Sequence, residues 1–184
     1  MKALIAYATR YGATAGTSEE IAKIRREEGF DVKIANLKKE KIKDVSDFDL
    51  VVVGSGLQMA RWVGEAEDFL NKFRRELAQK KVAIFVSSMK TALEREGKTD
   101  ELAKSREIAL EAKATKYGLH PVSMGMFGGC VDYNKMNFIT RKAMGAIKEQ
   151  LEKDGFKENP PGVYDMRDWD EIRSWARDLA NKAR

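Results

Sequence analysis

The sequence ALIAYATRYGAT, at residues 3–14, passes from an apolar run into hydroxyl residues and one glycine. The apolar part is typical of a buried strand, and we expect a helix to begin at about Thr14 to Thr17. The N–H groups of a helix's first turn have no partner within the helix, and the helix dipole favours negative charge there. Thr9 and Thr14 add hydroxyl donors, and Gly12 lets the backbone approach a ligand closely. The stretch therefore predicts a strand, an anion-binding turn and a helix.

The predicted anion is a single phosphate group. The turn lacks both the G-x-x-x-x-G-K-[ST] pattern of nucleoside triphosphate loops and the G-x-G-x-x-G pattern of dinucleotide sites. Arg10 either adds charge to the phosphate or points to solvent, and Tyr11 either packs beside the ligand or covers the loop. The predicted phosphate-binding residues are Thr9, Arg10, Tyr11, Gly12, Ala13 and Thr14.

The rest of the chain alternates apolar, β-branched runs with amphipathic segments, which is typical of a parallel α/β sheet. We expect five parallel strands in the order 2-1-3-4-5, with helices on both faces and ligands beyond the carboxyl ends of the strands. Asp168 is expected to cap the last helix. The predicted strands are Lys2–Ala8, Asp31–Ala35, Leu50–Val53, Val82–Val86 and His120–Phe127. The predicted later helices cover residues 64–77, about 100–112, 139–151 and 169–179.

Three further strand-end loops are rich in glycine, serine, methionine and aromatic residues. Glycine admits a flat ligand, while methionine and aromatic side chains cover its face. Together with the phosphate turn, these loops predict a planar aromatic cofactor that carries one phosphate, a description that flavin mononucleotide (FMN) meets. Alternatively, Gly54 and Gly56 only turn the chain, and Trp62 packs against the helix at 64–77. The predicted ring-binding residues are Ser55, Gly56, Leu57, Gln58, Met59, Ser87, Ser88, Met89, Gly125, Met126, Phe127 and Gly128.

The sequence identifies no catalytic residue. The single histidine, His120, is expected at the start of the fifth strand, away from the ligand, and the single cysteine, Cys130, is typical of a small apolar packing residue. With one of each, we expect no metal site. The segment 131–138 either faces a substrate or a membrane, or simply leads into a helix.

Length and charge set the class of protein. A chain of 184 residues is expected to form one domain, 1–184, and no apolar run reaches the length of a membrane span. No signal peptide is recognised, so we expect a cytoplasmic protein. The net charge of +5 reflects a lysine-rich surface, or attraction to an acidic partner, an anionic membrane surface or a carboxylate-bearing substrate. Its basic clusters are not interleaved with aromatic residues, so we expect no nucleic-acid binding.

The sequence YATRYGAT at residues 7–14, followed by Ile21-Ala22, resembles the flavodoxin phosphate-binding motif. More closely, the chain resembles the flavodoxin-type, menaquinone-dependent protoporphyrinogen oxidases and their relatives. These proteins share a T-[RK]-x-G-x-T segment and a V-V-[IV]-G segment, the latter matched by 51–54. Their acidic-tryptophan helix start and aromatic-alanine pair are matched by Asp168-Trp169 and Trp175-Ala176. The resemblance spans essentially the whole chain, with departures at Gly16, Thr17 and the loop after Gly56.

The resemblance implies a flavodoxin-like three-layer sandwich that binds FMN. It further implies an oxidoreductase of haem biosynthesis that takes electrons from a porphyrinogen and passes them to a quinone, with peripheral contact to the membrane. The alternative is a flavodoxin-like electron carrier between redox protein partners. Carriers of this type are typically acidic, so the charge of +5 argues against that reading. A quinone reductase that uses a nicotinamide cofactor is a third class, but no motif supports nicotinamide binding.

Overall fold

Five parallel strands form the centre of the computed structural model, which describes residues 1–183. Arg184, the last residue of the predicted domain, lies outside the described residues. The sheet order is β2-β1-β3-β5-β6, and a two-residue strand, β4 (Arg61–Trp62), pairs antiparallel with the end of β3. Without β4, this order is the predicted 2-1-3-4-5, which is therefore confirmed. The parallel strands are β1 (Lys2–Ala8), β2 (Asp31–Asn36), β3 (Leu50–Gln58), β5 (Lys81–Ser88) and β6 (Ser123–Gly128).

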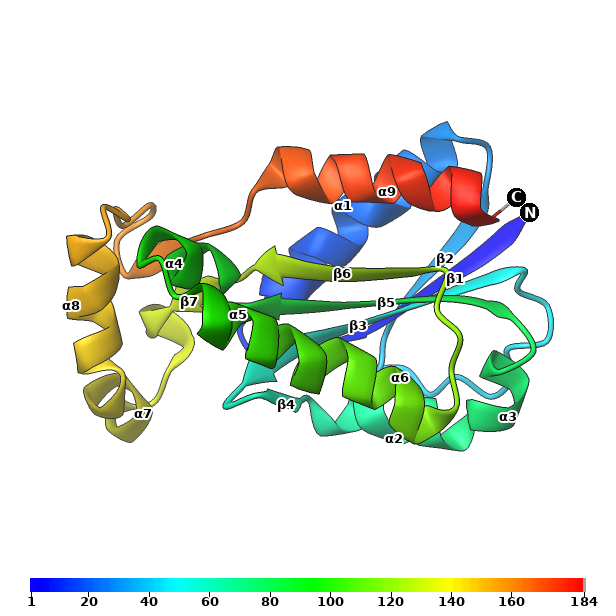
Figure 1. Cartoon of the computed structure of the whole chain (residues 1–184), viewed down its shortest axis with the longest axis horizontal. Helices are drawn as coiled ribbons and strands as arrows, with labels where there is room; N and C mark the ends of the chain where they lie inside the picture. The colour runs from blue at the N-terminus through cyan, green and yellow to red at the C-terminus, as the bar shows by residue number, and fades with distance from the viewer. Residues whose placement is uncertain (184) are drawn as a thin grey trace.

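Helices cover both faces of the sheet, which makes the three layers visible in Figure 1. Alternate strand residues enter two separate cores: Leu4 and Val51 face one, and Ile5 and Val52 face the other. The first face is covered by α2 (Gly64–Lys72), α3 (Arg74–Leu77) and a long helical stretch made of α5 (Thr99–Arg106), a π-helical turn (Glu107–Glu111) and α6 (Ala112–Tyr117). The second face is covered by α1 (Ala13–Glu27) and α9 (Trp169–Ala183).

A substructure that the sequence did not predict lies beyond the carboxyl ends of the strands, where Figure 1 shows α7 and α8. We call residues 129–167 the roof segment. Near its two ends lie the strands β7 (Cys130–Asp132) and β8 (Val163–Asp165), which pair antiparallel with Val131 opposite Tyr164. The predicted helix 139–151 is wrong as one helix, because it is broken at Met144 into α7 (Phe138–Ala143) and α8 (Gly145–Lys153). A third hydrophobic cluster holds the segment together, and α4 (Lys90–Arg95) contributes Ala92 to it.

Contacts define the starts of two helices. Asp168 Oδ1 accepts hydrogen bonds from the N–H groups of Asp170 and Glu171, so the predicted cap of α9 is confirmed. Gly16 lies inside α1, which begins at Ala13. A Cβ on Gly16 would lie 2.5 Å from Arg167 Nη1, so the glycine makes room for the end of the roof segment.

One half-buried ion-pair cluster joins the helices on the first face. Glu67 of α2 accepts hydrogen bonds from Lys113, Lys116 and Tyr117 of α6. Burial alone raises the pKa of the Glu67 carboxyl, but these hydrogen bonds and the charge of Lys113 lower it to about 2. Among residues 1–183, no helix is long and apolar enough to cross a membrane.

Candidate functional site

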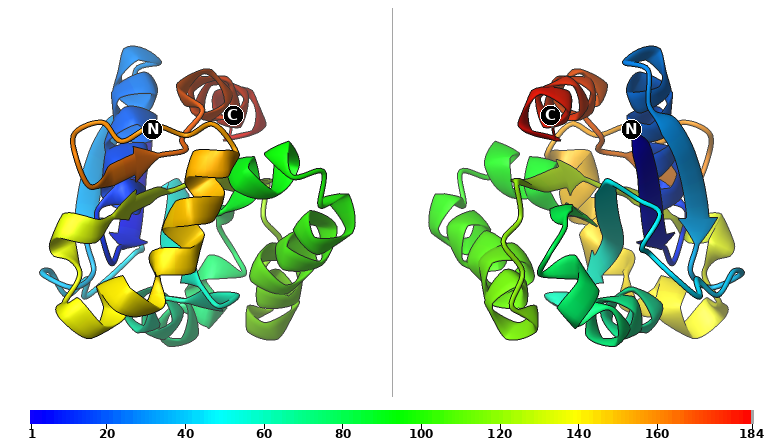
Figure 2. Two further views of the ribbon diagram at one scale, coloured as in Figure 1. Left: turned by 90° about the vertical axis from the view of Figure 1, so that its left-hand side faces the viewer. Right: turned by 90° about the vertical axis from the view of Figure 1, so that its right-hand side faces the viewer.

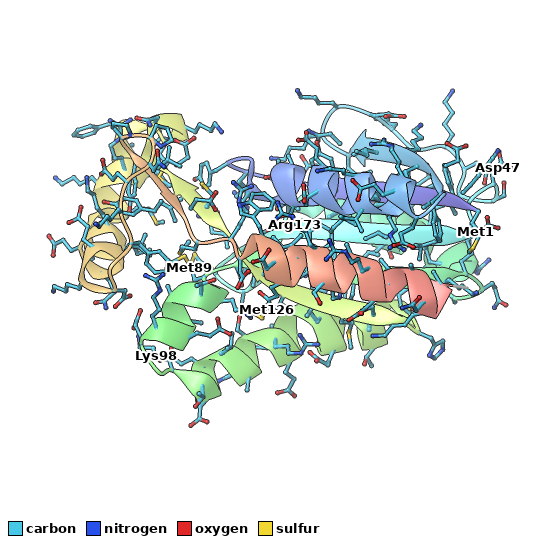
Figure 3. The ribbon with its side chains drawn as sticks, turned by 90° about the horizontal axis from the view of Figure 1, so that it is seen from above. Met1, Asp47, Met89, Lys98, Met126 and Arg173 are labelled. Carbon is cyan, nitrogen blue, oxygen red and sulfur yellow. The ribbon has the colours of Figure 1, made fainter. Side chains whose placement is uncertain are left out.

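A cavity of about 480 Å³ lies between the carboxyl ends of the strands and the roof segment. Figure 2 shows the roof segment in front of the strand ends in its left view. Figure 3 places Met89 at this end of the sheet, facing α8, while Met1 and Asp47 lie at the opposite end. The predicted residues that line the cavity are Thr9, Arg10, Tyr11, Ala13, Thr14, Gly56, Leu57, Gln58, Met59, Ser87, Ser88 and Met89. The three strand ends β1, β3 and β5 are thus brought together as expected.

The turn after β1 is an uncapped helix start. Gly12 adopts a φ of 103°, a left-handed conformation that favours glycine, and no side chain caps α1. The Gly12 N–H donates to Thr9 Oγ1 at 3.0 Å, and the Gly12 carbonyl accepts from the Gly16 N–H at 3.2 Å. The N–H groups of residues 13–15 come before this first helical hydrogen bond, so they have no partner within the helix. The first turn of α1 contains no acidic residue, so nothing within it competes with an anionic ligand.

Thr14 carries the strongest sign of a ligand at this turn. Its side chain is fully buried and its Oγ1 has no hydrogen-bond partner among the described residues, although the residue lines the cavity. A buried hydroxyl without a partner costs about 1–3 kcal/mol, so such groups are normally satisfied. Ser87 Oγ, at the end of β5, is also buried without a partner and also lines the cavity. Two buried hydroxyls that line the cavity, one at the start of α1 and one at the end of β5, thus lack a hydrogen-bond partner among the described residues.

The loop after β3 is a tight hairpin. Gln58 pairs with Arg61, and the two residues between them, Met59 and Ala60, have φ values of 51° and 58°. These positive values are typical of two-residue hairpin turns, in which asparagine and glycine are preferred. The side chain of Met59 is 90% exposed at the rim of the cavity. The hairpin therefore contributes Leu57, Gln58 and the exposed Met59 to the lining of the cavity.

Trp62 and Ser55 are used inside the protein. The Trp62 indole N–H donates to the Ala109 carbonyl at 2.8 Å, in the π-helical turn, and the ring is buried. Trp62 is thus packed inside the protein, as in the alternative that gave it no ligand role. Its hydrogen bond, however, goes to the π-helical turn and not to the predicted helix 64–77. Ser55 Oγ accepts from the Val63 N–H at 2.9 Å and donates to the Gly56 carbonyl at 3.0 Å, so it holds the hairpin, and Ser55 does not line the cavity.

The end of β6 differs from the prediction. Gly125, Met126, Phe127 and Gly128 do not line the cavity. Phe127 is buried against Phe85 and Trp175, with ring centroids 5.8 and 5.5 Å away. A Cβ on Gly128 would lie 1.9 Å from the Met166 carbonyl oxygen. β6 continues to Gly128. The residues that line the cavity at this strand end are the next three, Gly129, Cys130 and Val131.

Sequence reasoning missed the wall that the roof segment provides. Three of its lining residues, Ile139, Ala143 and Ile147, recur at helical spacing within the predicted helix 139–151. That helical face borders the cavity, and Ile139 is 79% exposed. The 131–138 segment offered a partial signal, since a substrate-facing role was one of its two interpretations. The lining residues of the roof segment are Gly129, Cys130, Val131, Met136, Ile139, Thr140, Ala143, Met144, Ile147 and Met166.

The lining is apolar and rich in methionine. Its only titratable side chains are Arg10, Tyr11 and Cys130. Burial raises the pKa of the Cys130 thiol, and the charge of Asp165 raises it further, so the thiol stays protonated at neutral pH. Within residues 1–183 no cluster of histidine, cysteine and carboxylate side chains is arranged to hold a metal ion. The arrangement thus suits binding and orienting a ligand more than moving protons.

The cavity fits the ligand class expected from the sequence. One end offers an uncapped helix start with an unpaired threonine hydroxyl, which suits a phosphate. The remainder offers glycine backbone, an unpaired serine hydroxyl and methionine side chains, which suit a flat aromatic ring with polar edges.

Comparison with known proteins places this geometry among related folds. The family model described as flavodoxin domain matches residues 4–158. No curated protein matches the chain. A flavodoxin from the domain Archaea is similar over 100% of this chain and 99% of its own, with a TM-score of 0.58 and 18% identity. Flavodoxin 2 from Bacillus cereus is similar over 99% of both chains, with a TM-score of 0.58 and 19% identity. Rubredoxin oxygen:oxidoreductase from Desulfovibrio gigas is similar over 98% of this chain and 36% of its own, with a TM-score of 0.51 and 18% identity. At these identities the solved structures establish the likeness of fold alone.

Proposed function

The chain belongs to the family of flavodoxin domains, and from this premise we propose that it binds FMN in the cavity and transfers electrons through it. Members of this family bind FMN. The observation that carries the proposal is the unpaired, fully buried Thr14 hydroxyl at the uncapped start of α1, at one end of an apolar cavity of about 480 Å³. A phosphate there satisfies the hydroxyl and the first-turn N–H groups together.

In this proposal the protein holds and orients the cofactor. The turn from Thr9 to Thr14 binds the phosphate, and the backbone of 56–58, the Ser87 hydroxyl and Met89 surround the ring. The roof segment shields the ring from water on its other side. Bound FMN supplies the redox chemistry, because its ring system accepts and releases electrons. We also propose that the whole chain, 1–184, acts as one domain, since α9 packs on α1 and completes the second face.

For the reaction, we propose an oxidoreductase of the menaquinone-dependent protoporphyrinogen oxidase type. The support is the roof segment, whose apolar wall faces the strand ends across the cavity and suits contact with a large, mainly apolar molecule such as a quinone. Each turnover removes two electrons and two protons from the porphyrinogen and delivers two electrons and two protons to a quinone, which becomes a quinol. Phe138 and Ile139, 80% and 79% exposed at the start of α7, would contact the membrane surface from the cytoplasmic side, where the net charge of +5 favours anionic lipid.

The second candidate is an electron carrier between redox protein partners. It is favoured by the exposed tip of the β3–β4 hairpin, where Met59 is 90% exposed and leaves that rim of the cavity open to a docking protein. In this case the protein needs no pocket for a small substrate, and the roof segment serves only to shield the cofactor.

The test begins with the purified protein and FMN. Flavin absorbance that remains after gel filtration, and FMN identified after heat release, support the proposal, while failure to bind FMN overturns it. Protoporphyrinogen is then added anaerobically with and without menaquinone. Porphyrin formation that depends on the quinone supports the oxidase. No turnover, together with electron transfer from the chemically reduced protein to a redox protein, supports the carrier.

A further inference from the structure

Lys135 joins the roof segment to the phosphate turn across 124 residues of sequence. It ends the short 3-10 helix Tyr133–Lys135, and its Nζ donates to the Tyr11 carbonyl oxygen at 3.0 Å. The same Nζ lies 3.3 Å from the point that a Cβ on Gly12 would occupy. An ammonium group therefore lies directly against the turn that starts α1, where the sequence offered only Arg10 as a cation, with solvent as its alternative direction.

The position of this ammonium is held by a buried carboxylate. Asp132 is 8% exposed, its Oδ2 lies 3.2 Å from Lys135 Nζ, and its Oδ1 accepts from the Asn134 N–H at 3.0 Å. A lysine ammonium has three hydrogens to donate. Among the described residues two are directed to Tyr11 and Asp132, which leaves one for a ligand. Lys135 does not itself line the cavity, but its Nζ lies against Tyr11, which does, and its side chain is 57% exposed, so a ligand that extends over the turn can reach it.

Besides Arg10, which lies on the turn itself, a further cation near the turn is committed elsewhere. Arg167 donates through Nε and Nη2 to Asp165 and stacks on Trp169, and its Nη1 lies 3.5 Å from the Ala13 carbonyl. The first turn of α1 has no acidic residue to neutralise an added positive charge. The anion site itself is marked independently by the unpaired hydroxyl of Thr14, which is fully buried and lines the cavity.

We propose that Lys135 binds the phosphate of the cofactor and so makes the site selective for the phosphorylated flavin over riboflavin. This inference rests on the proposed function, because it takes FMN as the ligand of the cavity. It goes beyond that function by assigning the phosphate site a cation that comes from the roof segment. Cofactor binding then strengthens the contact between the phosphate turn and the roof segment, because the phosphate bridges the two.

The test compares FMN and riboflavin, which differ by the phosphate alone, on Lys135→Met, Lys135→Arg and Lys142→Met. Lys142 lies on α7 of the same segment and is exposed, and among the described residues it makes no hydrogen bond to the phosphate turn, so it controls for the general loss of one charge. Dissociation constants come from flavin fluorescence at low and high salt. We expect Lys135→Met to weaken FMN about tenfold, as the loss of one partly exposed charge contact predicts. Riboflavin affinity and both affinities of Lys142→Met should stay unchanged, and Lys135→Arg should restore most FMN affinity.

The outcomes distinguish failure of the phosphate contact from failure of the proposed function. If Lys135→Met weakens FMN and riboflavin equally, Lys135 only fixes the fold of the turn and the inference is overturned. An unchanged FMN affinity overturns it as well, while leaving the proposed function standing. If the unaltered protein binds neither flavin, the proposed function fails and the inference fails with it. A smaller dependence of FMN affinity on salt in Lys135→Met than in the unaltered protein is the further result expected from a phosphate contact.

Discussion

Replacing Thr14 by valine should have opposite effects on the empty and the FMN-bound protein. Valine keeps the branched shape of threonine and removes only the hydroxyl. In the ligand-free protein, Thr14 Oγ1 is buried without a partner, so its removal takes away a desolvation cost of about 1–3 kcal/mol. We expect the free energy of unfolding to rise by about 1 kcal/mol, which for a chain of this size raises Tm by about 2–4 °C.

With FMN bound, the same hydroxyl would donate to a charged phosphate. A hydrogen bond to a charged group contributes about 1.5–3 kcal/mol, so its loss should weaken FMN binding about tenfold to about a hundredfold. Two measurements suffice: urea unfolding of the ligand-free protein, and FMN titration followed by flavin fluorescence. The affinity should fall while the stability rises.

Thr17 provides a matched control one turn further along α1. It is also fully buried with an unpaired Oγ1, but it does not line the cavity. Thr17→Val should therefore stabilise the ligand-free protein by a similar amount and leave FMN affinity unchanged. Equal FMN affinities for Thr14→Val and the unaltered protein would refute the placement of the phosphate. A loss of stability in the ligand-free Thr14→Val protein would refute the reading of its hydroxyl as unsatisfied.

Three further variants test the local geometry. Ala60→Gly should raise the free energy of unfolding by about 0.5–1 kcal/mol in urea, because its φ of 58° strains alanine more than glycine; a decrease would contradict that conformation. Gly128→Ala should lower it by about 3 kcal/mol or more, because its Cβ would meet the Met166 carbonyl, whereas Gly145→Ala, with open space around it, should not destabilise. Glu67→Gln should lower the free energy of unfolding by about 1 kcal/mol after allowance for solvent screening. Thermal unfolding across pH measures this difference. Because the folded-state pKa of about 2 lies below the usual 4.5, that difference should be full above pH 4.5 and vanish as pH falls toward 2; a constant difference would argue against the shift.

The sheet could be predicted because its signals are local. Each central strand is an apolar run buried on both faces, so composition alone marks it, and the predicted bounds of the first strand equal those observed. Strand ends were less accurate. The predicted strand Leu50–Val53 continues to Gln58, because glycine and serine can extend a ladder when a neighbouring strand such as β5 supplies hydrogen-bond partners.

The error at the end of β6 follows from the same cause. Gly125, Met126, Phe127 and Gly128 were assigned to the ligand because they were expected to form a strand-end loop. The ladder with β5 instead continues to Gly128, and the Phe127 side chain turns into the core against Trp175. A glycine-rich, aromatic sequence is compatible with a strand or with a ligand-binding loop. The packing of Phe127 against Trp175 of α9, which is distant in sequence, decides between them.

The phosphate end and the ring end of the site therefore differ in what determines them. The phosphate turn is one continuous stretch, so its residue types and spacing already predict its chemistry. The opposite wall depends on pairing Val131 with Tyr164 and on the contact of Lys135 with Tyr11, which link residues far apart in sequence. Such contacts leave little trace in local composition. The cofactor is thus encoded by a local motif, whereas access to it is set by the tertiary placement of the roof segment. Substitutions in α7 and α8 should accordingly alter which molecules reach the cavity, while those in the turn from Thr9 to Thr14 should alter whether the cofactor binds at all.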